Sequence, residues 1–254
     1  MGSEFYRVAD TETRLLSLLH AVVLVAAAFV VGSLVYATAG SALRSLGYEV
    51  TPLATLAPLP YAVLTATQFV GFFLVIGIYV EYRGGGDLFE VDVPSLRDVG
   101  WVVVGFVALL AVATVVSVIL RSAGIDTATN QVITQGEQDP VRFLYLVPVT
   151  FLFVAPAEEL LFRGLIQGLF RRAYGIVPGI VLASAFFGLP HYFALMDGGG
   201  NVASTLVLVS VLGVVLGTLY EVTGNLLVPI LVHGCWNTMT FVSQYLGAAG
   251  HLGG

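Results

Sequence analysis

The sequence predicts an all-α fold, a polytopic bundle of about seven or eight transmembrane helices. Hydrophobic residues make up 57% of the 254 residues and charged residues only 10%, against roughly 45–50% and about 25% in soluble domains. The mean hydropathy is +0.94, which is too apolar for one water-soluble core. Apolar runs of about 20 residues, long enough to cross a bilayer as a helix, recur along the chain. We therefore expect an integral membrane protein.

The first 140 residues are expected to form one part of the molecule, with three membrane helices and a polar loop. The helices are predicted at Leu16–Ala39, Leu59–Val80 and Val99–Leu120. Arginine, acidic or glycine clusters bound each of these runs, and none of them carries obvious chemistry. The loop Ser122–Pro140 is polar and is expected to be either a short surface helix or a disordered connection.

Residues 141–254 are expected to form a second part, a bundle of the last four spans with the functional site in a cavity between them. The first of these spans begins near Val141, reaches Ala155 and continues through Pro156–Tyr174; a break inside it would bring the total to eight. The other three are predicted at Ile176–Leu195, Val202–Tyr220 and Leu226–Leu246.

The charged residues constrain partners and orientation. All ten basic residues are arginine, and the net charge is −6, so nucleic acid is not an expected partner. The single cysteine, Cys235, excludes an internal disulfide and a multi-cysteine metal site. Arginines concentrate in cytoplasmic loops, and six fall on the amino-terminal side (Arg7, Arg14, Arg83, Arg97, Arg171, Arg172) against three on the other (Arg44, Arg121, Arg142). We expect a plasma-membrane protein with a cytoplasmic amino terminus; the sequence does not determine its oligomeric state.

Two adjacent acids and an arginine lie in the fourth span, where ionisable groups are costly unless they are paired or face water. Glu159 and Arg163 are four residues apart, so they share a helix face and can pair. Glu158 lies roughly 140° from Arg163 on the same helical arithmetic and is free for another task, such as accepting a proton. An alternative is that both acids cap a helix that starts after Pro156.

Two histidines and an amide occupy the later spans. His233 lies well inside an apolar segment, and Asn237 projects from the same helix face. Helix–helix hydrogen bonding is the alternative role for that pair, and His191 could be an interface residue near the end of its span. A proline shortly precedes each polar site (Pro156, Pro190, Pro229); interrupted helices at membrane depth are tolerated where they line a wet cavity.

Three segments resemble the motifs of a known family. Glu158-Glu159-Leu160-Leu161-Phe162-Arg163, Phe187-Gly188-Leu189-Pro190-His191 and His233-Gly234-Cys235-Trp236-Asn237 are similar to the EExxxR, FxxxH and HxxxN motifs of the CPBP family. That family includes type II CAAX prenyl endopeptidases and Abi-type bacteriocin-processing or immunity proteins. The resemblance covers residues 141–246.

The resemblance implies an intramembrane endopeptidase that cleaves near the carboxyl terminus of a lipidated (CAAX-type) or membrane-associated peptide. In that reading Glu158 and His191 activate a water, and His233 and Asn237 stabilise the oxyanion. Glu159, Arg163 and Phe187 support the site. Besides a peptide or lipidated protein, the expected partner is membrane lipid.

Two alternatives stay open. No cofactor is favoured, but Glu158, His191 and His233 could hold a zinc ion and make the protein a metalloendopeptidase; the HExxH motif is lacking. The second alternative is a non-enzymatic membrane protein, either an immunity-like binding protein or a proton or solute carrier. The lack of an internal repeat weakens the carrier hypothesis.

Overall fold

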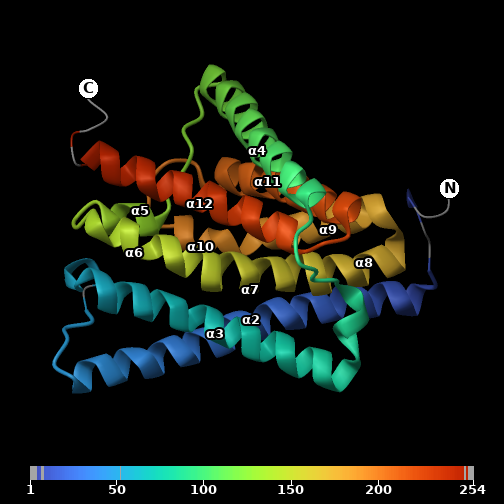
Figure 1. Ribbon diagram of the computed structural model, residues 1–254, viewed down its shortest axis with the longest axis horizontal. Coiled ribbons are helices and arrows are strands. Elements are labelled where there is room, and N and C mark those ends of the chain that lie inside the picture. The colour runs from blue at the N-terminus through green and yellow to red at the C-terminus, as the bar shows by residue number, and fades with distance from the viewer. Residues whose placement is uncertain (1–4, 7–8, 52, 249, 251–254) are drawn as a thin grey trace.

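The computed structural model describes residues 5–6, 9–51, 53–248 and 250. Within these residues the chain forms helices joined by turns, and no β-strand occurs there (Figure 1). The predicted all-α fold is confirmed. Most helices lie along one another in a bundle, while α4 (Leu96–Ser122) leans away from the others at one end (Figure 1).

Among the residues that the structure describes, six helical stretches are long and apolar enough to cross a membrane. They are α2 (Thr11–Ser45), α3 (Pro58–Arg83), α4, the continuous run Val141–Tyr174, the run Ile176–Leu195 and α11 (Val202–Thr223). The predicted seventh span also forms a helix, α12 (Leu227–Ala248), which packs along α4 and α11. It carries the polar residues His233, Asn237 and Gln244 among its apolar side chains.

The fourth span is a single unbroken run, so the eighth span that a break would have added does not form. Its elements are α6 (Val141–Val149), η3 (Thr150–Val154), α7 (Ala155–Glu159), η4 (Leu160–Ile166) and α8 (Gln167–Tyr174). The segments η3 and η4 are π-helical, a geometry found mostly as short insertions near functional sites. Because the helix continues on both sides of α7, no helix starts at Pro156, and the capping explanation for the two acids is wrong.

The fifth span is interrupted near its end. Helix α9 (Ile176–Gly188) passes into a 3-10 turn, η5 (Leu189–His191), and then into the short α10 (Tyr192–Leu195). Pro190 lies inside this turn, where its missing N–H is tolerated. The change of helix type therefore occurs at the position of His191.

Helices α2 and α3 cross at a pair of glycines. A Cβ on Gly71 would lie 2.4 Å from the Cα of Gly32, and a Cβ on Gly32 would lie 2.7 Å from the carbonyl oxygen of Gln68. The crossing is visible in Figure 1, where α2 and α3 lie across each other along one side of the bundle. Glycine at both positions lets the two backbones touch, as in other small-residue crossings in membranes.

The largest apolar cluster joins the two parts of the chain. It combines buried side chains of α2 and α3, such as Leu24 and Phe72, with those of η4 and α9, such as Leu165 and Phe187. The first two helices therefore pack directly against the segment that carries the acids.

The polar loop contains a short helix, so it is not a disordered connection, but this helix is partly buried and does not lie on the surface as predicted. Helix α5 (Gln131–Gly136) begins at Asn130, whose side chain accepts a hydrogen bond from the Val132 amide. Asn is a favoured residue at this position because it satisfies a free N–H of the first turn.

One arginine used to predict orientation is not a surface loop residue. Arg142 is 2% exposed and donates hydrogen bonds to the carbonyl oxygens of Leu56 and Gln135. It therefore connects α6 to the polar segment 122–140 and to the turn before α3. Arg7 lies outside the described residues.

Candidate active site

A cavity of about 410 Å³ lies in the middle of the bundle and contains the predicted site residues. Glu158, His191, His233 and Asn237 all line it. The prediction placed this cavity among the last four spans, but its wall also includes side chains of α2, α3 and α4, namely Phe29, Phe69, Phe72 and Leu109. The first part of the chain thus completes the cavity, while the second supplies its ionisable groups.

Glu159 and Arg163 form the predicted pair. Arg163 Nε lies 3.2 Å from Glu159 Oε2, and the two side chains are 1% and 0% exposed. Arg163 also donates from Nη2 to the carbonyl oxygen of Gly213, at 3.4 Å. A Cβ on Gly213 would lie 3.3 Å from that Nη2, so glycine lets the guanidinium approach α11. A buried charge needs such partners because it has lost its hydration.

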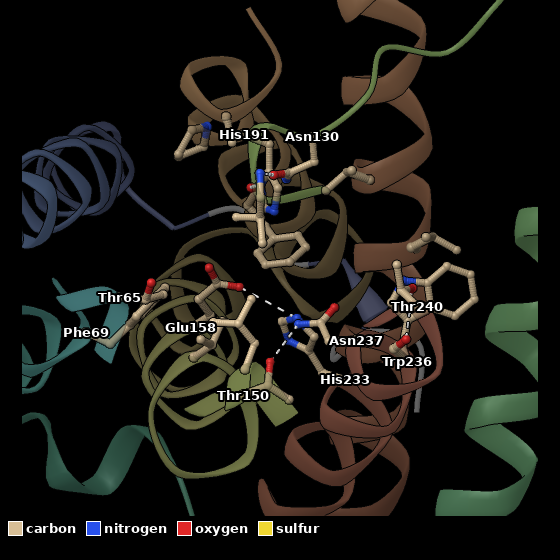
Figure 2. Close-up of a pocket in the computed structure, with 18 of the residues that line it drawn as sticks. Thr65, Phe69, Asn130, Thr150, Glu158, His191, His233, Trp236, Asn237 and Thr240 are labelled. Atoms are coloured by element: carbon tan, nitrogen blue, oxygen red, sulfur yellow. Dashed lines mark hydrogen bonds and ion pairs between the residues drawn. The ribbon is translucent and has the colours of Figure 1, made fainter. Parts of the chain in front are cut away.

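His233 lies between the two acids. Its Nδ1 is 2.8 Å from Glu159 Oε1 and its Nε2 is 3.7 Å from Glu158 Oε2. A carboxylate only accepts hydrogen bonds, so Nδ1 carries a hydrogen and donates to Glu159. Figure 2 shows the imidazole of His233 with Nε2 turned toward Glu158. Both acids therefore contact the last helix through one ring.

The two acids have different environments, as their helical spacing predicts. Glu159 is fully buried and held by Arg163 and His233. Glu158 lines the cavity, and its side chain is 15% exposed. Glu158 is the carboxylate that a molecule in the cavity can reach.

Phe187, four positions before His191, contacts this histidine through both its backbone and its ring. Its carbonyl oxygen accepts a hydrogen bond from His191 Nδ1 at 2.9 Å. Since a carbonyl cannot donate, His191 in its neutral form keeps an unprotonated Nε2. The Phe187 ring contacts the rings of His191 and His233, with centroids 4.9 and 5.9 Å away, and the Arg163 guanidinium lies 4.1 Å from its centroid.

Thr150 is a site residue that the sequence did not indicate. It is 1% exposed, lines the cavity, and accepts a hydrogen bond from Asn237 Nδ2 at 3.3 Å (Figure 2). A threonine inside an apolar run has no distinctive spacing, and its partner is 87 residues away in the sequence. Only the packing of η3 against α12 brings the two together.

Residues 140–239 match the family model described as type II CAAX prenyl endopeptidase Rce1-like. This segment is therefore similar to that family. The match includes all three motif segments and confirms the resemblance seen in the sequence. It excludes α2, α3, α4 and α5. No curated protein and no solved structure matches the chain.

The matched segment brings Glu158, His233 and Asn237 together and places His191 on the same cavity. The three predicted zinc ligands were Glu158, His191 and His233. Among the described residues, no three or more His, Cys, Asp or Glu side chains are grouped closely enough to hold a metal ion. Glu158, His191 and His233 thus line one cavity without forming a metal-ligand cluster in this arrangement.

Proposed function

We propose that this membrane protein is an endopeptidase that hydrolyses a peptide bond near the carboxyl terminus of a lipidated, CAAX-type or other membrane-associated peptide. One observation carries the proposal: Glu158 faces the cavity, while Glu159 beside it is held by Arg163 and His233. One carboxylate is therefore free to take a proton and the other is not. The Rce1-like match supports the same activity.

In the proposed first step, a water molecule attacks the carbonyl carbon of the peptide bond. Glu158 accepts a proton from this water, and His191 Nε2 accepts a hydrogen bond from its other O–H and so orients it. The oxygen–carbon bond forms as the carbonyl becomes a tetrahedral oxyanion. The apolar wall favours this step because a charge that develops away from bulk water interacts more strongly with nearby donors.

In the second step, the tetrahedral intermediate collapses. Asn237 stabilises the oxyanion through the Nδ2 hydrogen that Thr150 does not bind, and His233 does so through Nε2–H when the ring carries both protons. The carbon–nitrogen bond then breaks, and Glu158 returns its proton to the leaving amine. The products are a carboxylic acid and an amine, and the enzyme regains its starting state.

We also propose that the protein resides in the plasma membrane with its amino terminus in the cytoplasm. The supporting observation is the arginine distribution: Arg14 lies near the start of α2, Arg83 ends α3, and Arg171 and Arg172 lie in the last turn of α8. These helix ends lie toward the same end of the bundle in Figure 1. Cysteine labelling from either side of intact cells, at single introduced sites, tests this topology.

The substrate can be identified by comparing carboxyl-terminal peptides in membranes that contain the wild-type protein or Glu158→Gln. We expect peptides that are shortened only with the wild type. Glu81→Gln is the matched control, because Glu81 is an exposed acid outside the cavity. Peptides that bind but are never shortened would favour the immunity-like binding function, and Glu158-dependent proton flux in liposomes would favour the carrier.

Cleavage after removal of metal ions tests whether the protein is a zinc-dependent endopeptidase. We expect purified protein to keep its cleavage rate after dialysis against a zinc chelator, because the proposed base is a carboxylate. Loss of activity with the chelator, with recovery on addition of zinc alone, would show that a metal ion performs a step.

A further inference from the structure

The polar loop between α4 and α6 forms part of the cavity wall. Asn130, Val132 and Ile133 from this loop line the cavity that holds Glu158 and His191. The loop lies outside the Rce1-like match. These wall residues therefore come from a part of the chain that the match does not cover.

Hydrogen bonds hold this loop at two places. Toward α11, Gln131 Nε2 donates to Asp197 Oδ2 at 2.7 Å, and the Ala128 amide donates to Thr205 Oγ1 at 2.7 Å in a buried position. Toward α3, Tyr61 Oη donates to Gln135 Oε1 at 2.9 Å. Asn130 lies between these attachments, so its backbone is fixed on both sides.

Only one of the two polar atoms of the Asn130 side chain has a hydrogen-bond partner within the described part of the chain. Its Oδ1 accepts the hydrogen bond from the Val132 amide at 2.9 Å that caps α5. This bond sets the orientation of the carboxamide. Its Nδ2 has no acceptor among the described residues of the chain, and in Figure 2 Asn130 lies at the same end of the cavity as His191. An oriented N–H donor is thus available on the cavity side of the loop.

The surroundings of Asn130 make this donor distinctive. The cavity wall to which Asn130 belongs is mainly apolar and includes Val132, Ile133 and Ala194. A peptide that enters such a cavity loses water from its backbone carbonyls, and an unpaired buried carbonyl is unfavourable. A fixed amide N–H removes that penalty for one carbonyl and so selects the position of the peptide.

We propose that Asn130 is a substrate-binding residue that donates its Nδ2–H to a backbone carbonyl of the bound peptide, beyond the bond that is cleaved. This role of Asn130 rests on the proposed peptidase function only because it takes a peptide as the ligand. The α5 loop then helps to set the register in which a peptide meets Glu158 and His191.

Two substitutions at Asn130 remove the Nδ2–H donor while they keep an oxygen that caps α5. Asn130→Asp keeps a side-chain oxygen for the Val132 amide and replaces the donor with an acceptor, while Asn130→Ser keeps the cap without adding charge and shortens the side chain. The matched control is Asn201→Asp. Asn201 caps α11 in the same way, through the Ser204 amide, and does not line the cavity.

The measurement is carried out on the full-length protein in liposomes with a carboxyl-terminal peptide that the wild type cleaves. We expect KM to rise about tenfold for both Asn130 variants, with kcat nearly unchanged, because a hydrogen bond shared by ground and transition states is lost. Asn201→Asp should match the wild type. Unchanged KM in both Asn130 variants, or an equal rise in Asn201→Asp, would overturn the proposal.

A binding assay keeps this result separate from the catalytic proposal. The affinity of a fluorescent peptide is measured in the Glu158→Gln background, with and without each Asn130 substitution. Weaker binding by about tenfold supports the donor role even if the wild type fails to cleave the peptide. Equal affinity contradicts it even if the wild type is an active peptidase. Unchanged thermal unfolding is expected because the cap is preserved.

Discussion

Phe187 joins the parts of the site that the sequence presents separately. Its backbone holds His191, and its ring contacts both histidines and the guanidinium of Arg163. Stacking of a guanidinium on an aromatic face adds to the stability of a buried cation. The spacing of the FxxxH segment thus follows from the geometry of one helical turn, with a single side chain serving three neighbours.

Substitution of Thr150, a single residue, tests whether Asn237 acts as an oriented donor. Thr150→Val removes the hydroxyl that accepts from Asn237 while keeping the shape of the side chain. We expect kcat to fall about five- to tenfold with little change in KM, because an interaction of about 1 kcal/mol that orients a transition-state contact is lost. Thr150→Ser should retain most of the activity. Steady-state cleavage kinetics in liposomes measure both.

The double variant shows whether Thr150 acts through Asn237. In an Asn237→Ala background, Thr150→Val should cause no further loss, since the group that it orients is already gone. Independent, multiplicative losses would mean that Thr150 has a merely structural role.

At the scale of elements, the sequence predicted the spans well because each is a long apolar run between charged or glycine-rich turns. The four predicted spans of the second part agree with the helices to within a few residues. The same reasoning separated Glu158 from Glu159 through the angle between helical positions. It did not indicate the π-helical segments or the cavity-lining position of α5, because both depend on packing between distant parts of the chain.

The crossing of α2 and α3 leads to a prediction with a control in the same helix. Gly71→Ala introduces a Cβ that meets the backbone of Gly32, whereas a Cβ at Gly77 would meet nothing within 4 Å. We expect Gly71→Ala to lower the unfolding temperature because the helices must separate. Gly77→Ala should leave the temperature unchanged or raise it slightly, since alanine favours the helix by roughly 0.5–1 kcal/mol over glycine. Thermal unfolding in detergent measures both, and equal effects would contradict a tight crossing.

At the scale of the whole molecule, the two parts have different roles in one cavity. The segment that matches the Rce1-like family model carries the acids, the histidines and Asn237, and the earlier helices close the apolar wall with Phe29, Phe69 and Phe72. The sequence could assign the first role, because charged residues are rare in this chain and stand out in a span. It could not assign the second, since an apolar side chain that faces a cavity has the same pattern as one that faces lipid.

The central claim is that Glu158 is the proton acceptor in peptide hydrolysis within this cavity. The most direct measurement is the cleavage rate of purified protein in liposomes, for the wild type, Glu158→Gln and the exposed control Glu81→Gln, with thermal unfolding recorded for each. We predict that Glu158→Gln lowers kcat by at least about 100-fold, the usual contribution of a general base. The kcat of Glu81→Gln should stay near that of the wild type, and both variants should unfold near the wild-type temperature. A folded Glu158→Gln protein that cleaves the peptide at the wild-type rate would contradict the account.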